Sequence, residues 1–143
     1  MSMGLFERAA ESEGRILQVE QLIESGVEPM PDRGIGYLLT FDIGRILVLP
    51  DRARESLKFR QISNLEEVAE IQMVSLGEED PWWKVMGQLL TRAWPGGQGE
   101  GAVSSDGEPE EIRLQFRSDT ENPKMIFLRY VSNRVHVGEA VGS

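Results

Sequence analysis

The chain has 143 residues, no cysteine and a formal net charge of −9, with 24 acidic and 15 basic residues. This length suits a single domain over residues 1–143, in which residues 1–3 and 139–143 are expected to be loose. The lack of cysteine excludes disulfides, thiolate metal sites and cysteine nucleophiles. The negative charge disfavours nucleic acid and membrane surfaces as partners. The sequence shows no leader pattern and no apolar run near the roughly 20 residues of a membrane span, so we expect a cytoplasmic protein.

The beginning of the chain predicts a short helix, a strand and a loop. Residues 5–12 suit a helix with its apolar side chains along one stripe, and Gly14 ends it. In residues 15–23 apolar and polar side chains alternate, which favours a strand. Residues 26–34 contain prolines and glycines that interrupt regular structure, so we expect a loop there.

A β-hairpin is the strongest local signal. Residues 35–41 and 45–49 are apolar runs typical of strands, and a short turn containing Gly44 joins them. Glycine is suited to this turn because it adopts positive φ readily. Both alternating sets of side chains in the hairpin are apolar, so we expect both of its faces to be covered. Residues 57–60 alternate and predict a third, half-exposed strand.

All three tryptophans lie in residues 82–94, which predict a second helix. Asp80 can cap the helix, and Pro81 suits its first position because proline lacks the N–H that would be unpaired there. The apolar side chains of this helix would share one face, formed by Trp82, Val85, Met86 and Leu89. Gly87 is an alternative end point, after which residues 89–94 would begin a strand.

The last part of the chain predicts further strands after an acidic, glycine-rich loop. The loop spans residues 96–109, and strands are expected at residues 112–116, 125–131 and 135–137. Together these elements predict one α+β domain with a curved antiparallel β-sheet of about six strands and one or two short helices packed on one face.

Few residues support catalysis or metal binding. His136 is the single histidine, and it lacks the partners that a catalytic or zinc site requires. The glycines at residues 96–101 lack the Lys-Ser/Thr pair of a phosphate-binding loop. The carboxylates of Asp106, Glu108, Glu110 and Glu111 lack the alternating pattern of a calcium loop. We therefore assign no catalytic residue, no cofactor and no metal site.

The tryptophan segment predicts either a core anchor or a contact surface. Adjacent side chains on a helix point about 100° apart, so we expect one of Trp82 and Trp83 in the core and the other at its rim. Tryptophan and arginine are frequent anchors of protein interfaces. The predicted interaction surface comprises Trp82, Trp83, Arg92 and Trp94.

The order of these segments resembles that of a family of small uncharacterised bacterial β-meander proteins of unknown function. The resemblance is carried by Phe41-Asp42-Ile43-Gly44, residues 82–94, Gln98-Gly99, residues 112–116 and residues 126–137. In that family a helix precedes a β-meander, and a Gly–Trp segment followed by Gln-Gly leads into the last strands. An Asp-Gly pair often follows closely there, whereas Asp106-Gly107 comes later here, after residues 100–105. The resemblance implies a fold and carries no assigned activity.

Two functions from different classes fit these features. We favour a small non-enzymatic binding or accessory protein, of inhibitory or immunity type, that contacts another protein through the tryptophan segment and the acidic stretches at residues 64–80 and 95–111. The alternative is an enzyme or small-ligand-binding protein that uses carboxylates in a pocket between sheet and helix. A self-associating protein is a further hypothesis, so the expected partner is another protein or a second copy of this chain.

Overall fold

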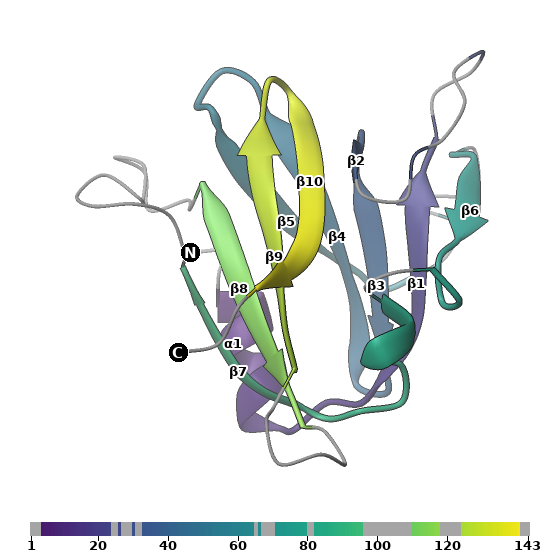
Figure 1. Ribbon diagram of the computed structural model, residues 1–143, viewed down its shortest axis with the longest axis vertical. Coiled ribbons are helices and arrows are strands. Elements are labelled where there is room, and N and C mark those ends of the chain that lie inside the picture. The colour runs from purple at the N-terminus through teal and green to yellow at the C-terminus, as the bar shows by residue number, and fades with distance from the viewer. Residues whose placement is uncertain are drawn as a thin grey trace.

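Antiparallel β-strands dominate the structure, a computed structural model that describes residues 4–23, 26, 30, 33–64, 66, 71–79, 82–95, 110–117 and 124–140 (Figure 1). The elements are α1 (Gly4–Glu11), β1 (Ile16–Leu22), β2 (Arg33–Gly34), β3 (Tyr37–Phe41), β4 (Gly44–Asp51), β5 (Ser56–Ile62), β6 (Met73–Ser75), the 3-10 turn η2 (Trp82–Lys84), β7 (Leu90–Pro95), β8 (Glu111–Phe116), β9 (Lys124–Val131) and β10 (Arg134–Ala140). In the described ranges they form two five-stranded sheets, with the orders β5-β4-β3-β1-β6 and β2-β10-β9-β8-β7.

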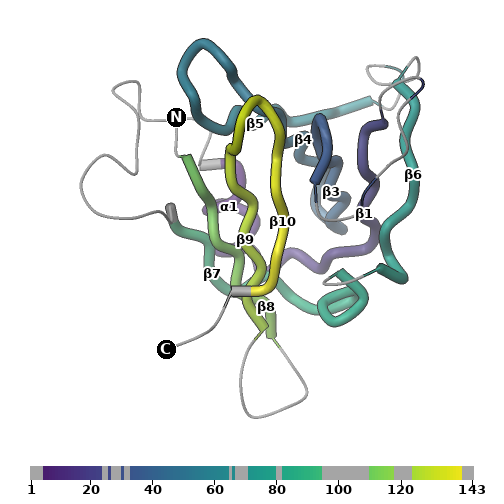
Figure 2. The backbone as a smooth tube through the Cα atoms, turned by 45° about the horizontal axis from the view of Figure 1, so that its top comes forward, coloured from purple at the N-terminus to yellow at the C-terminus, as the bar shows by residue number. Residues whose placement is uncertain are grey.

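The main core lies between the two sheets. In both backbone views β9 and β10 lie in front of β5 (Figures 1 and 2), and β4 packs against β10 while β5 packs against β9. Alternate side chains of each strand point inward. Leu39 and Val48 from the first sheet and Leu114 and Leu128 from the second therefore belong to one buried cluster. The outward side chains of the second sheet do not belong to this core.

The β3–β4 hairpin is covered on both faces, as its composition predicts. Leu39 and Val48 point into the main core, and the cross-strand partners Leu38 and Leu47 point the other way into a second buried cluster. The turn between the two strands is short, because Phe41 pairs directly with Gly44. Gly44 has a φ of 149°. The predicted hairpin, its glycine turn and the third strand at residues 57–60 are confirmed.

Helix α1 packs against β7 and β5, at the side where these edge strands of the two sheets approach each other. Its anchor is Phe6, whose ring is fully buried and lies edge-on to Phe41 and Phe59 at centroid distances of 6.5 Å and 5.2 Å. The helix ends before Gly14, whose N–H donates to the carbonyl of Ala9 at 2.8 Å. In the described part of the chain, no helix is long and apolar enough to cross a membrane.

The antiparallel α+β class is confirmed, but the prediction of one sheet with about six strands is wrong. β6 pairs with the free side of β1, and β2 pairs with β10. These strands have three and two residues, too few to show an alternating pattern. The predicted single meander is divided between two sheets, because β3 to β5 belong to one sheet and β7 to β10 belong to the other.

A single 3-10 turn replaces the predicted second helix. Gly87 adopts a φ of 79°, and its N–H donates to the carbonyl of Ile16 at 2.8 Å, which turns the chain toward β7. The alternative with a strand after Gly87 is therefore correct. Asp80 and Pro81, the predicted start of the helix, lie outside the described residues.

The end of the chain is more ordered than predicted. Glu139 and Ala140 belong to β10 and pair with Ile126 and Met125 of β9, so the expectation that the chain is loose from residue 139 is wrong for these two residues. The strand continues because β9 offers backbone partners along its whole length. Residues 1–3 and 141–143 lie outside the described ranges.

Candidate functional site

The structure separates the two adjacent tryptophans of the predicted surface. Trp82 is fully buried, with its ring centroid 6.4 Å from that of Tyr37, whereas Trp83 is 55% exposed. The ammonium group of Lys84 lies 5.9 Å from the centre of the Trp83 ring and pairs with Glu139 at 2.6 Å. The prediction of one core tryptophan and one exposed tryptophan is confirmed, and Trp82 belongs to the core.

The other two predicted residues lie together on the outer face of the second sheet. Arg92 and Trp94 are two positions apart on β7 and pair with the outward residues Gln115 and Arg113 of β8. The guanidinium carbon of Arg92 lies 5.0 Å from the centre of the Trp94 ring. Such a cation–π contact is attractive and holds the long arginine side chain against the ring.

A row of four residues crosses the second sheet through Trp94. The register places Trp94 opposite Arg113, Arg113 opposite Phe127, and Phe127 opposite Gly138. Residues that pair directly share one face of a sheet and have Cβ atoms about 5 Å apart. These four residues therefore form a continuous line from β7 to β10, here called the central row.

Gly138 provides the space that the Phe127 ring occupies. A Cβ atom at position 138 would lie 2.6 Å from Cζ of Phe127, so the ring lies across the backbone of β10. The guanidinium carbon of Arg129 lies over the same ring, 5.1 Å from its centre. The ring is thus held between a glycine and a guanidinium group.

Glu111 holds two arginines of this face in place. Its side chain is fully buried; Oε2 accepts from Nε of Arg113 at 2.9 Å, and Oε1 accepts from Nε of Arg129 at 2.6 Å. The side chains of the two arginines are 36% and 43% exposed. A guanidinium group has five N–H donors, so both arginines keep donors beyond those that Glu111 accepts. The carboxylate orients the arginines without using all of their hydrogen-bonding capacity.

Four arginines form a diagonal across the same face, here called the arginine stripe. Arg92 on β7, Arg113 on β8, Arg129 on β9 and Arg134 on β10 are each displaced by one strand and two residues from the previous one. With strands about 4.8 Å apart and about 3.3 Å per residue, successive members lie about 8 Å apart. Trp94 and Phe127 flank the stripe on either side of Arg113.

The outer face of the second sheet is basic although the whole chain is acidic. Arg33 on β2 pairs with His136 and adds a further arginine beside the stripe. By register, Glu111 is the one carboxylate among the described outward residues of β7 to β10, and no lysine is among them. The net charge of −9 therefore conceals a local surface of the opposite sign.

The sequence indicated part of this face and missed the rest. Alternation in residues 112–116 already placed Arg113 on the polar side of its strand. What the sequence does not contain is the register between strands, and the register alone places Arg113 between Trp94 and Phe127. Glu111 stood in an acidic stretch that suggested solvent exposure, whereas its side chain is buried under arginines.

The residues considered for metals and catalysis do not form a site in the described structure. His136 is half-buried on the outer face, opposite Arg129 and Arg33. Both carboxylate oxygens of Glu111 accept hydrogen bonds from arginines. Within the described ranges, no group of three or more His, Cys, Asp or Glu side chains is placed to hold a metal ion. Asp106, Glu108 and the glycines at 96–101 lie outside those ranges.

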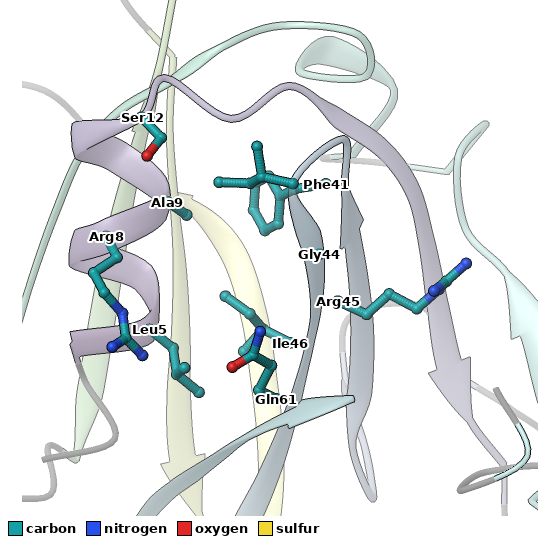
Figure 3. A pocket seen from close by; sticks show the side chains of 10 residues that line it. Leu5, Arg8, Ala9, Ser12, Phe41, Gly44, Arg45, Ile46 and Gln61 are labelled. Atoms are coloured by element: carbon teal, nitrogen blue, oxygen red, sulfur yellow. The ribbon is translucent and has the colours of Figure 1, made fainter. Parts of the chain in front are cut away.

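A cavity of about 420 Å³ lies between α1 and the β3–β4 hairpin, where the alternative function requires a pocket (Figure 3). Its apolar lining includes Leu5, Phe41 and Ile46, and its polar lining includes arginines and an amide. None of the lining residues is a carboxylate, and the side chain of Arg45 points away from α1. The predicted pocket is present, but the carboxylates expected in it are not part of its described lining.

Comparison of the chain with protein-family models, with curated proteins and with solved structures finds no match.

Proposed function

We propose that this chain is a non-enzymatic binding protein that recognises another protein through the outer face of its second sheet. One observation carries the proposal: the register places Arg113, which a buried carboxylate holds, between Trp94 and Phe127 of the neighbouring strands. Arginine and tryptophan are the residue types that most often dominate the energy of protein interfaces. Here they stand side by side on rigid strands rather than on loops.

The composition of this face supports a protein partner. The centres of protein interfaces are enriched in aromatic residues, methionine and arginine and depleted in lysine. The described outward residues of β7 to β9 follow this composition; they are Arg92, Trp94, Glu111, Arg113, Gln115, Met125, Phe127, Arg129 and Val131. An ordinary solvated sheet face would carry lysine and several acidic residues instead.

The side chains of this face are also ordered before a partner arrives. Phe127 is seated against Gly138, Arg113 and Arg129 are held by Glu111, and Arg92 lies on Trp94. Fixing one flexible side chain during association costs about 0.5–1.5 kcal/mol, and contacts that already exist in the free protein reduce this cost. This pre-ordering favours binding by the face as it stands.

The proposal is tested by capture with matched double variants. Arg92→Gln with Trp94→Ala removes one arginine and one tryptophan from the face, and Arg45→Gln with Trp83→Ala removes the same residue types elsewhere. Tagged wild-type and variant proteins are used to capture partners from a lysate of the source cells, with quantification by mass spectrometry. We expect a protein that the wild type and the control retain and the face variant loses. The same retained proteins for all three baits would contradict the proposal.

A further inference from the structure

We infer that the partner presents an extended, carboxylate-rich segment to the arginine stripe, which passes between Trp94 and Phe127. This inference rests on the proposed function and adds the chemistry of the partner. The observations that carry it are the arginine stripe, the guanidinium donors that remain beside Glu111, and the aromatic rings that flank Arg113.

Charge complementarity selects an acidic segment. The stripe gathers arginines on one face of a chain whose net charge is −9, and the single outward carboxylate of the described strands β7 to β10 is buried beneath two of them. Guanidinium groups bind carboxylates with paired, charge-assisted hydrogen bonds. A basic or neutral partner would offer no counter-charge to Arg92 or to the positive charge that a single carboxylate leaves on Arg113 and Arg129, which is costly when the interface loses its water.

The spacing of the stripe suits a segment in extended conformation. Successive arginine positions are about 8 Å apart along the diagonal, while every second residue of an extended chain is about 6.6 Å apart. Arginine side chains are long enough to absorb this difference. Acidic residues at alternate positions would therefore reach Arg92, Arg113 and Arg129 in turn, with the methylene groups of their side chains beside the rings.

A single-stranded nucleic acid suits this face less well. Proteins that bind single strands offer aromatic ring faces on which bases stack. Here Arg92 lies over the Trp94 ring, and Phe127 lies between Gly138 and Arg129. The net negative charge of the remaining chain also repels a long polyanion more than a short acidic peptide.

The experiment measures fluorescence anisotropy of short labelled probes with the full-length protein. The first probe is a peptide of alternating glutamate and leucine, and the second has glutamine in place of each glutamate. The third is a single-stranded DNA oligonucleotide of mixed sequence. Arg92→Gln is the test variant because Arg92 is exposed and lies opposite Gln115, four residues along β8 from Glu111, so we expect the fold to be preserved. Arg45→Gln is the control with the same loss of charge on the other sheet.

The wild type is expected to bind the glutamate peptide at least about tenfold more tightly than the glutamine peptide, because guanidinium groups make stronger hydrogen bonds to carboxylates than to neutral amides. Arg92→Gln should weaken binding of the glutamate peptide roughly tenfold, and Arg45→Gln should leave it unchanged. Added salt should weaken this binding, because the charges are partly exposed.

Four outcomes would overturn the inference. Equal binding of both peptides, with loss in Arg92→Gln, would refute the acidic segment while leaving the proposed binding face intact. Tighter binding of the oligonucleotide than of the peptide would assign the face to nucleic acid. If the peptide does not bind and sedimentation shows a doubled mass that Arg92→Gln abolishes, the face is assigned to a second copy of the chain. If the peptide does not bind and the mass is not doubled, the acidic segment is also refuted.

Discussion

Glu111 and Arg129 stand directly opposite each other on β8 and β9, and Nε of Arg129 lies 2.6 Å from Oε1 of a carboxylate that is fully buried. Arg113 approaches the second oxygen of the same carboxylate. One buried acid therefore sets the positions of two arginines on the proposed binding face. This arrangement links the stability of the second sheet to the geometry of its outer surface.

The two arginines are expected to stabilise the fold jointly. Arg113→Gln or Arg129→Gln alone should lower the free energy of unfolding by roughly 1 kcal/mol, because the remaining arginine still pairs with Glu111 and both are partly exposed. The double variant should lose more than the sum, by about 1–3 kcal/mol, since it removes both arginines that pair with a buried carboxylate. Urea denaturation measures these differences. Adding Glu111→Gln to the double variant should recover stability; strictly additive losses without recovery would show that the carboxylate is not a shared anchor.

Gly138→Ala should disturb the binding face more than the fold. Its Cβ would lie 2.6 Å from the Phe127 ring, which sits on the outer face and can move aside at a cost of about 1 kcal/mol. We expect changed NMR signals for the Phe127 ring and weaker partner binding, with a melting temperature lowered by only about 2–6 °C. Gly77→Ala is the matched control, because its Cβ would meet only Met86 at 3.9 Å. An unmoved Phe127 ring in Gly138→Ala would contradict the packing described here.

The adjacent tryptophans should differ sharply in their effect on stability. Trp82→Ala removes a fully buried ring from the core and should cost about 3–5 kcal/mol, a large part of the stability of a small domain. Trp83→Ala removes a side chain that is 55% exposed and should change stability by less than about 0.5 kcal/mol. Thermal unfolding of both variants distinguishes them. Similar losses for the two would mean that Trp83 is also part of the core.

Gly87 should be sensitive to substitution for a backbone reason alone. Its φ is 79°, and a Cβ atom there would meet nothing within 4 Å, so only conformational strain opposes a side chain. Gly87→Ala should cost about 1–2 kcal/mol, and Gly87→Asn should cost less because asparagine tolerates positive φ better. Urea denaturation of the two variants provides the comparison. Equal stability of the wild type and Gly87→Ala would mean that residue 87 does not have a positive φ.

Local signals in the sequence were sufficient for most individual strands. Alternation identified β1, β5 and β8, a nearly all-apolar run identified β9, and the apolar runs around Gly44 identified the hairpin and the coverage of both its faces. These features depend on neighbouring residues, so composition and spacing reveal them. The division into two sheets depends instead on pairings such as β2 with β10, which join residues far apart in the chain.

The binding face also depends on pairings between strands that the sequence does not reveal. Arg92 and Trp94 were identified by residue type, but Trp82 was assigned to the same surface and is buried. Arg113 and Phe127 are common residue types, and nothing in the sequence singles them out as site residues. They become neighbours of Trp94 only through the register of three strands, and a shift by one residue would turn each of them to the opposite face.

Photo-crosslinking in the source cells tests the central claim most directly, because it records contact at a chosen residue. A photoreactive amino acid replaces Gln115, which lies on the outer face of the second sheet beside Arg92, or Lys58, which is exposed on the first sheet. The binding face described here predicts a crosslinked partner from position 115 and none from position 58. The same partner at equal yield from both positions, or from position 58 alone, would contradict it.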